Sequence, residues 1–549
     1  MNEVTEGFRA LADRIVDDLL SWDPVAATWL GDHRFDGQLP DYSDAHLEVL
    51  RIANEDHLTA LDAVDDVELG LEDAVDLEIL RAALARAHFE ITELRPTTWN
   101  PMVWNPGTAL HLILARDYAP LAERLDALRS RLAAVPDFLA TAQASLQDMP
   151  RIHVETAILQ LRGARGLIAG QVAAVVDDAE VVEAAQAAVA SFIAWLEARL
   201  DRSDRDPRLG ERLYSATLWH SLDDDTSAVV LLDEAEEFLN GVTDELRQTA
   251  SLYLDEAEPA NPTEADALVR RALLRVAMDA PVTNGTVLPI VAGAVDRTLD
   301  FVRAHDLVGV PPLDVEVIEM PEIHRGVAVA YCDAPGPLET AKVPTFVAVS
   351  PTPADWDAAR VESFYREYNG IQLHDLTIHE AFPGHVLQLA HARQLQSPTL
   401  VRRFGMSGVF VEGWAVYAEQ LMLDRGYRPH DEPRSALAIR LQQLKMQARM
   451  TINAILDIRV HAYGMTEEQG IALMMDRGFQ EEGEAVGKWR RALLTAGQLP
   501  TYFVGFRSVT GIAHDLRVLH PDWTDRQVHD LMLSQGSPAP RHLRTLLGI

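Results

Sequence analysis

The sequence contains a single cysteine, Cys332, among its 549 residues. One cysteine excludes an intramolecular disulfide and a metal site built from several thiolates. We interpret Cys332 as a small buried side chain close to a strand.

Basic residues are also scarce. The chain has 48 Lys and Arg against 84 Asp and Glu, which gives a formal net charge of -36, and the only lysines are Lys342, Lys445 and Lys488. The electrostatic field of such a negatively charged protein repels phosphate backbones and anionic lipids. We therefore expect neither nucleic acid nor a membrane as a partner, while the oligomeric state is left open.

Long hydrophobic runs are missing as well. The longest apolar stretches, such as 167–176, are much shorter than the roughly 20 residues that cross a bilayer. Residues 1–18 are acidic and amphipathic, without the basic region and apolar run of a secretory signal. These two absences predict a cytoplasmic protein.

What remains is the balance of an ordinary globular protein, with 48% hydrophobic and 24% charged residues. Apolar residues recur at steps of three and four through most of the first 300 positions, for example over 121–132 and 181–200, which predicts amphipathic helices. Short β-branched segments at 315–317, 327–331 and 345–349 predict a small sheet. Helical periodicity then returns after Trp356.

The predicted fold is therefore mainly α, with a small β-sheet near residues 314–350. The length exceeds the size at which single cores stop growing, so we expect two lobes. A helical N-terminal lobe would cover residues 1–310, and a second lobe with the sheet and the C-terminal helices would cover 311–549. We expect the two lobes to be interwoven as one unit.

The first chemical signal is the segment His379-Glu380-Ala381-Phe382-Pro383-Gly384-His385. It begins like the zinc peptidase motif HExxH, in which two imidazoles one turn apart bind the metal and the Glu activates water. Here the second histidine comes two residues too late. On an unbroken helix, six residues of about 100° each would place His385 roughly 240° around from His379, so a regular helix would refute the site.

Pro383 and Gly384 resolve this conflict. Proline removes a backbone donor and clashes with the preceding turn, and glycine accepts unusual dihedral angles. We therefore predict a break or bulge that returns His385 to the face of His379 and leaves Glu380 beside the metal. The alternative is a capped helix end with incidental histidines.

The second signal is a helical segment, 410–419, that contains two glutamates. Glu412 and Glu419 are seven residues apart and project from nearly the same face. Carboxylates in such an apolar helix are costly unless they are paired or coordinated. One could bind a metal while the other orients a ligand, and a solvated glutamate is the alternative for each.

The segments IHEAFPGHVLQ and FVEGWAVYAE closely resemble a bacterial family of unknown function that carries the motifs HEAxPGH and EGWAxYxE. Further matches lie at 24–36, 448–461 and 499–505, so the resemblance covers most of the chain. By motif order this family is similar to the helical gluzincin peptidases, such as thimet oligopeptidase, angiotensin-converting enzyme and carboxypeptidase Taq. The resemblance implies a two-lobed gluzincin-like body with a deep channel.

The resemblance also implies roles for individual residues. His379, His385 and Glu412 would bind the metal. Glu419 would support these ligands without binding the metal itself, and Glu380 would be the general base. Three such ligands with one open position indicate Zn²⁺. The expected reaction is hydrolysis of short peptides by metal-activated water, with Glu380 moving the proton to the leaving amine.

Five further residues are candidates in the C-terminal third, where related peptidases place a tyrosine or histidine that stabilises the oxyanion. Tyr502 is the first choice, with a core aromatic as the alternative. His461 follows Asp457 by one turn, so the carboxylate could orient the imidazole, although a structural pair has the same spacing. Arg449 and Arg507 could bind a substrate carboxylate, with a structural ion pair as the alternative for Arg449.

Several questions stay open in the sequence. The strand at 345–349 could accept a substrate peptide at a free edge, unless both edges are paired. Carboxypeptidase and oligopeptidase activity are not distinguished. The chain could instead hydrolyse an ester or a non-peptide amide, or be an inactive helical protein that keeps the metal for stability.

Overall fold

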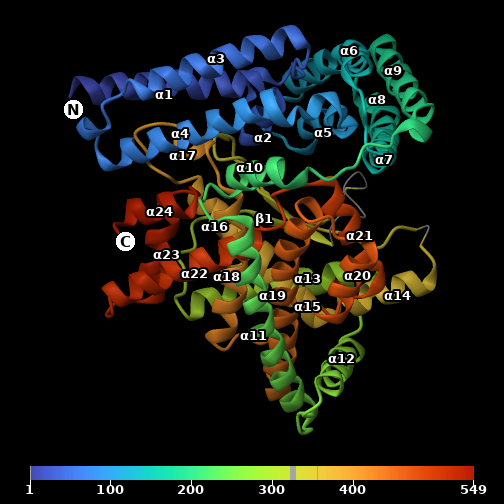
Figure 1. Cartoon of the computed structure of the whole chain (residues 1–549), viewed down its shortest axis with the longest axis vertical. Helices are drawn as coiled ribbons and strands as arrows, with labels where there is room; N and C mark the ends of the chain where they lie inside the picture. Colours follow the sequence, from blue (N-terminus) through green and yellow to red (C-terminus); the bar gives the residue numbers. More distant parts are fainter. Residues whose placement is uncertain (1, 322–328, 355) are drawn as a thin grey trace. The chain divides into compact units, whose positions relative to one another are not determined.

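The computed structural model describes residues 2–321, 329–354 and 356–549. It is mainly helical with one small sheet (Figure 1), which confirms the predicted fold class. Its contacts divide the chain into two compact units. The first comprises Met1–Pro207, Pro335–Val343 and Gln396–Gly405, and the second comprises Arg208–Ala334, Pro344–Leu395 and Met406–Ile549.

The first boundary between the units lies at Pro207, whereas the sequence led us to expect 310. The amphipathic patterns on both sides of residue 207 look alike, so periodicity does not show which core a helix joins. The long helix α11 (Ala228–Leu254) packs along α19 (Pro433–His461), and this contact assigns it to the second unit.

The first unit is built from amphipathic helices. The pattern at 121–132 falls in its helix α6, and most of the pattern at 181–200 falls in α9, which ends at Glu197. Asp23 caps α2 by accepting hydrogen bonds from Val25 and Ala26. Its helices are α1 (Glu3–Trp22), α2 (Pro24–Leu30), α3 (Asp44–Asp62), α4 (Leu71–Phe89), α5 (Gly107–Ala115), α6 (Leu121–Ser145), α7 (Arg151–Leu167), α8 (Ala173–Val175), α9 (Ala179–Glu197) and α17 (Val401–Phe404).

Helix α9 is long and apolar enough to cross a membrane by length and composition, and it is the one such helix among the described residues. This is weak evidence for a span, because helices in protein cores pass the same test. Val182, Val189 and Phe192 are buried, and α9 packs on α6 and α7.

Two late segments of the chain complete the first unit with ion pairs. Arg402 Nε lies 2.9 Å from Asp76 Oδ1, and both side chains are buried. His33, which follows α2, lies between Asp36 and Glu339, at 3.0 Å and 2.9 Å from their carboxylate oxygens. Residues more than 300 positions apart are thus joined in this unit.

The second unit surrounds α19, which packs against α11, α15, α18 and α22. Besides α11 and α19, its helices are α10 (Gly210–Leu222), α12 (Pro262–Asp279), α13 (Val287–Ala304), α14 (Ala358–Glu367), α15 (Gly370–Glu380), α16 (His385–Ala392), α18 (Gly408–Asp424), α20 (Glu467–Asp476), α21 (Glu482–Leu494), α22 (Thr501–Leu519), α23 (Asp525–Leu533) and α24 (Pro540–Leu547).

The sheet of the second unit has three strands in the order β1-β3-β2. β1 (Val315–Glu319) runs parallel to β3 (Thr345–Val349), and β2 (Ala330–Asp333) runs antiparallel to it. Both edges of β3 are therefore paired, so the idea that a substrate adds to the strand at 345–349 is wrong. The start of the predicted 327–331 segment lies outside the described residues.

Candidate metal centre

The first motif is split between two helices. α15 begins at Gly370, where Asn369 accepts hydrogen bonds from the N–H groups of Ile371 and Gln372, and it ends at Glu380. α16 begins at His385, and the peptide bond between Phe382 and Pro383 is cis. The regular helix that would have refuted the site is absent over 379–385, as predicted from the Pro-Gly pair.

Gly384 sets the geometry of this break. Its N–H donates to the carbonyl of Ile378 at 3.0 Å. A side-chain carbon at Gly384 would lie 1.8 Å from the carbonyl oxygen of His379, so only glycine fits. The tight return brings the imidazoles of His379 and His385 together, with ring centroids 4.7 Å apart and planes at 86°.

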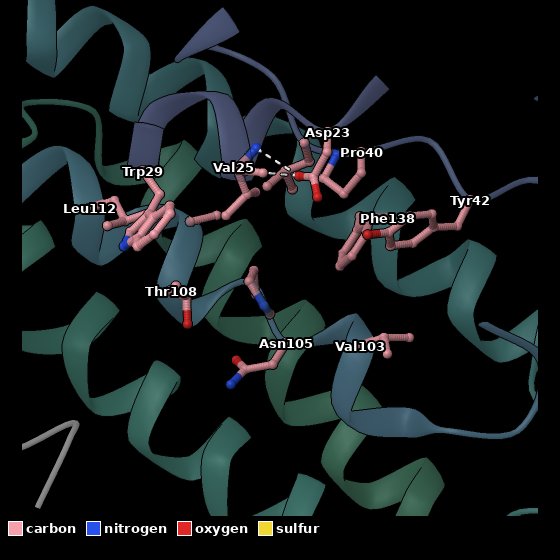
Figure 2. Close-up of a pocket in the computed structure, with 14 residues that line it drawn as sticks. Asp23, Val25, Trp29, Pro40, Tyr42, Val103, Asn105, Thr108, Leu112 and Phe138 are labelled. Atoms are coloured by element: carbon pink, nitrogen blue, oxygen red, sulfur yellow. Dashed lines mark hydrogen bonds between the residues drawn. The ribbon is translucent and has the colours of Figure 1, made fainter. Parts of the chain in front are cut away.

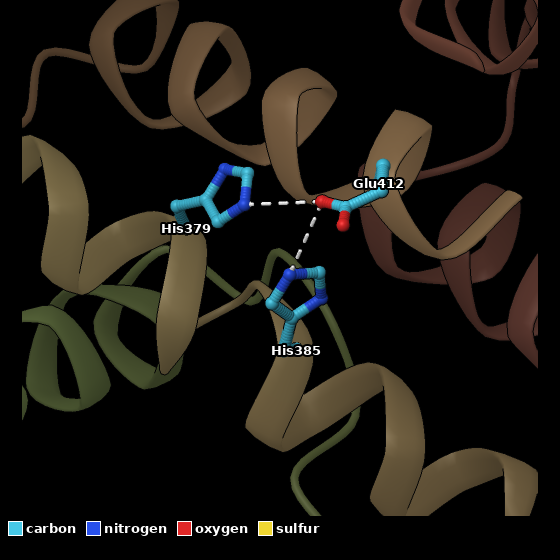
Figure 3. Close-up of side chains that lie close together, drawn as sticks. All are labelled: His379, His385 and Glu412. Carbon is cyan, nitrogen blue, oxygen red and sulfur yellow. Dashed lines mark ion pairs between the residues drawn. The ribbon is translucent and has the colours of Figure 1, made fainter. Parts of the chain in front are cut away.

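Helix α18 supplies the third side chain of the cluster. Glu412 Oε2 lies 3.5 Å from His379 Nε2 and 3.6 Å from His385 Nε2 (Figure 3). These separations exceed the usual hydrogen-bond length of about 3.2 Å. Glu412 Oε2 is buried without a hydrogen-bond partner in the described part of the chain. Two imidazoles and a carboxylate therefore point at one small space.

These three side chains fit a zinc ion. Their ligand atoms all lie within 4.8 Å of one another. Ligand atoms bound at about 2.1 Å to tetrahedral zinc are about 3.4 Å apart, close to the observed 3.5 Å and 3.6 Å. Imidazole and carboxylate donors without a thiolate also match the ligand set of catalytic zinc.

Glu419 orients one of the imidazoles. Its Oε1 accepts a hydrogen bond from His379 Nδ1 at 2.7 Å, and the carboxylate is fully buried. This contact places the proton on Nδ1 and leaves Nε2 as a ligand, a common support for metal-binding histidines. The structure thus brings together His379, His385, Glu412 and Glu419.

Other residues of the second motif hold the centre in place, and sequence reasoning missed their contacts. The indole N–H of Trp414 donates to the carbonyl of Pro383 at 2.8 Å. Tyr417 contacts His529 Nε2 at 2.7 Å and so links α18 to α23. Trp414 and Tyr417 lie two and five residues after Glu412 within one conspicuous motif, which was the available signal.

Glu380 lies beside the metal ligands and contacts the sheet. The backbone N–H of Cys332, in β2, donates to Glu380 Oε2 at 2.9 Å. Burial raises the pKa of Glu380, although the imidazoles of His385 and His379 oppose this shift. A general base whose pKa is raised toward neutrality is better able both to take up and to deliver a proton.

The charges in this cluster shift one another's proton affinities. Burial would raise the pKa of Glu412, but the imidazoles of His379 and His385 bring it well below its usual range. Burial would lower the pKa of His379, but Glu412 and Glu419 raise it well above its usual range. Without a cation, the site therefore favours positive charge on the imidazole of His379, as expected where a metal ion belongs.

Asp375 is a buried acid that sequence reasoning missed. It lies one turn before His379 on α15, and neither carboxylate oxygen has a hydrogen-bond partner among the described residues. Burial and the adjacent charge of Glu419 raise its pKa well above the usual range. The i, i+4 spacing from His379 was the signal that could have identified it.

Among the predicted C-terminal residues, Tyr502 is the one whose pKa the Glu412 carboxylate shifts. It is half-buried in the first turn of α22. Burial and the Glu412 carboxylate raise its pKa, whereas Arg491 and Gln498 lower it. Its position depends on close helix packing, because a side-chain carbon on Gly413 would lie 2.3 Å from the carbonyl carbon of Gly505.

His461 and Asp457 have structural partners. His461 Nε2 lies 2.8 Å and 3.0 Å from the backbone carbonyls of Ala492 and Thr495. Asp457 Oδ2 accepts hydrogen bonds from Tyr214 at 2.9 Å and from the N–H of Gly497 at 2.8 Å. These contacts fit the structural alternative for this pair, because the Nε2 of His461 is hydrogen-bonded to backbone carbonyls.

The two arginines predicted to bind substrate are held by carboxylates. Arg449 contacts Glu367 at 3.2 Å and Glu484 at 2.6 Å, which is the structural ion pair considered as the alternative. Arg507 is exposed on α22 and forms an ion pair with Glu234. Both guanidinium groups are therefore already paired with carboxylates of the protein.

A separate pocket of about 370 Å³ lies within the first unit (Figure 2). Its walls are mainly apolar and include Trp29, Leu112 and Phe138. Asp23 is the one charged lining residue, and its carboxylate caps α2. The described lining offers no cluster of catalytic or metal-binding side chains, so the chemistry of this chain points to the second unit.

The comparisons with known proteins agree with the motifs. The chain matches the family described as bacterial protein of unknown function, DUF885, over residues 24–547. A solved structure described as "a putative lipoprotein of unknown function" from Shewanella oneidensis is similar, with 28% identity, a TM-score of 0.81, and coverage of 99% of this chain and 100% of that chain. No curated protein matches the chain.

A second solved structure, described as "the putative lipoprotein" from Colwellia psychrerythraea, has a TM-score of 0.78 and covers 99% of both chains. At 16% identity this likeness shows the fold alone. Both neighbours are described as lipoproteins, which contradicts the prediction of a cytoplasmic protein. That prediction rested on missing sequence features, and a missing feature does not establish a compartment.

None of these matches is described as a peptidase. The part of the resemblance that they confirm is the bacterial family of unknown function. Because the match runs from residue 24 to residue 547 and includes both motifs, the chain belongs to DUF885, a family of bacterial proteins of unknown function.

Proposed function

We propose that the protein is a zinc-dependent peptidase that acts on short peptides. The observation that supports this most strongly is the convergence of His379 Nε2, His385 Nε2 and Glu412 Oε2 beside Glu380. Three protein ligands with one position left for water are typical of catalytic zinc. Zinc bound there would acidify that water and polarise the scissile carbonyl.

Glu380 is the proposed general base and acid. Its carboxylate is oriented by the N–H of Cys332 at 2.9 Å, and burial raises its pKa. It would take a proton from water as the water attacks the peptide carbonyl carbon. It would then deliver a proton to the amine nitrogen as the C–N bond breaks, so it ends in its starting state.

Tyr502 is the proposed hydrogen-bond donor to the carbonyl oxygen as that oxygen gains negative charge. Burial and the Glu412 carboxylate raise its pKa, so the hydroxyl keeps its proton and remains a donor at neutral pH. The first turn of α22 gives the side chain a rigid base. The proposed substrate is a short peptide, and the net charge of -36 disfavours nucleic acid.

The test compares zinc-loaded wild type with Glu380→Gln on a panel of short peptides and of esters with the same acyl groups. The control is Glu432→Gln, which changes an exposed glutamate before α19. Glu380→Gln should keep its zinc and lose about a hundredfold or more in peptide cleavage, while Glu432→Gln behaves as wild type.

Zinc-loaded wild type that cleaves only the esters would replace the peptidase proposal with a different hydrolase. Stoichiometric zinc without any turnover would favour a metal-binding protein that is not an enzyme. Undiminished cleavage by Glu380→Gln would remove this residue from the mechanism.

A further inference from the structure

The pocket of about 370 Å³ in the first unit has the size of a ligand-binding site. Pockets that bind small molecules typically measure about 300–1,000 Å³. Trp29 lines it from α2, Leu112 from α5 and Phe138 from α6, and residues 39–42 line it from the segment before α3. These elements all belong to the first unit, so the walls of the pocket come from one compact body.

Three aromatic side chains line this pocket. Trp29 and Phe138 lie on opposite sides of it (Figure 2). Tyr42 lies beside Phe138, with ring centroids 6.2 Å apart, and packs edge-on against the buried Trp104 at 5.3 Å. The large apolar side chain of Trp29 is 51% exposed. Aromatic side chains bind apolar groups, and the faces of their rings also attract cations.

Asp23 is the only charged residue in the described lining, and one of its carboxylate oxygens is unused. Its Oδ1 accepts hydrogen bonds from the N–H groups of Val25 at 3.1 Å and Ala26 at 2.9 Å. Within the described part of the chain, Oδ2 has no hydrogen-bond partner and Asp23 forms no ion pair. Figure 2 shows the Asp23 side chain at the top of the pocket, between Trp29 and Phe138.

Two groups close enough to interact with the charge of Asp23 leave its Oδ2 open. Burial and the charge of Asp23 raise the pKa of Tyr42, so this phenol stays neutral. Burial lowers the pKa of Arg131, and nearby acidic groups, including Asp23, oppose this shift. Arg131 is buried outside the lining, and its guanidinium donates to three backbone carbonyls and one hydroxyl. It therefore does not occupy either oxygen of Asp23.

We infer that this pocket binds a small organic cation, namely an ammonium group carried on an apolar body. The ammonium group would donate a charge-assisted hydrogen bond to Asp23 Oδ2, and the apolar body would lie between Trp29 and Phe138. The described lining contains no Lys, Arg or His that would compete for Asp23. The net charge of -36 also attracts cations and repels anions. This site is independent of the metal centre and of the proposed peptidase activity.

Ligand-observed NMR titrations of the full-length protein test this site with three probes that share a phenyl group. At neutral pH, 2-phenylethylamine is a cation, 2-phenylethanol is its neutral analogue and phenylacetate is an anion. The main variant is Asp23→Asn, because asparagine also caps helices and so removes the charge while keeping the cap of α2. The matched control is Asp178→Asn, which changes the cap of α9 outside the pocket lining. Thermal unfolding is measured for each variant.

We expect the wild type to bind 2-phenylethylamine with a Kd on the order of 1 mM and to bind 2-phenylethanol about fivefold more weakly. Phenylacetate should not bind. Asp23→Asn should bind the amine about fivefold more weakly and the alcohol as wild type does. Asp178→Asn should bind all three probes as wild type does. Trp29→Ala should weaken the amine and the alcohol alike, by about threefold or more, because both lose the same wall.

Equal affinities of the wild type for the amine and the alcohol would overturn the proposal, because the charge would then contribute nothing. Absence of saturable amine binding would overturn it as well. Unchanged amine binding by a folded Asp23→Asn would show that the amine binds elsewhere, for instance at the metal centre. If Asp23→Asn does not fold, Trp29→Ala decides, and unchanged amine binding by that variant overturns the site.

Discussion

The indole nitrogen of Trp414 lies 2.8 Å from the carbonyl oxygen of Pro383. The tryptophan comes from the helix that carries Glu412, and the proline belongs to the turn that sets the direction of His385. One hydrogen bond thus fixes two metal ligands relative to each other, although neither of its partners can bind a metal.

We predict that Trp414→Phe weakens zinc binding by about tenfold, because contacts that support metal ligands typically contribute tenfold to a hundredfold in affinity. The measurement is a zinc titration against a competing chelator. The control is Trp219→Phe, which loses a hydrogen bond of the same kind to Asp225 at an exposed position. Equal zinc affinity in both variants would show that the turn holds its shape without Trp414.

His385→Ala should abolish stoichiometric zinc binding, because His385 Nε2 is one of the three converging ligand atoms. Elemental mass spectrometry of protein purified without a chelating column measures this directly. The matched control, His391→Ala, changes a histidine on the same helix that contacts the carbonyl of Gly309. One zinc per chain in His385→Ala would show that the six-residue spacing does not define a ligand pair.

Gly505→Ala should destabilise the second unit by about 3 kcal/mol. The added methyl group would lie 2.1 Å from the carbonyl oxygen of Val409, so α18 and α22 would have to separate. Chemical denaturation measures the loss. Gly293→Ala is the control, since nothing lies within 4 Å of the added carbon at this exposed position of α13. The control should gain roughly 0.5–1 kcal/mol.

A fourth prediction concerns the pH dependence of stability through His33. Burial lowers the pKa of His33, but hydrogen bonds to Asp36 and Glu339 raise it to about 9, compared with about 6.5 in an unfolded chain. The protonated form therefore contributes its full stability below about pH 6.5, and this contribution is lost as the pH rises through 9.

His33→Gln should accordingly cost about 3 kcal/mol at pH 6 and much less at pH 10. Urea denaturation at both pH values measures the difference. His514→Gln, at an exposed position of α22, is the control and should cost the same small amount at each pH. A His33→Gln cost that is equal at pH 6 and pH 10 would show that protonation of His33 does not stabilise the fold.

Local hydrophobic patterns predicted the individual helices and strands of this fold better than the assignment of these elements to the two units. The β-branched run at 345–349 coincides with β3, and the periodicity at 121–132 falls inside α6. We expected interwoven lobes, but the sequence did not predict which segments cross between the units, because this depends on contacts such as that of Arg402 with Asp76. Such long-range ion pairs produce no hydrophobic periodicity in the sequence around either residue.

The site was predictable to the extent that its residues share short motifs. His379, Glu380, His385, Glu412 and Glu419 lie in two segments with recognisable spacing, and the structure brings them together. For Arg449 the sequence allowed either a substrate carboxylate or a structural ion pair, and it could not identify the partners Glu367 and Glu484, because they lie on other helices.

The division of the first unit into three separate segments has a consequence for synthesis on the ribosome. Domains generally fold from the N-terminus as they emerge. Here residues 1–207 emerge first, but the buried Asp76 carboxylate gains its Arg402 partner only after nearly 200 further residues have been translated. The nascent first unit thus carries an incomplete interior until the metal-binding histidines have already left the ribosome.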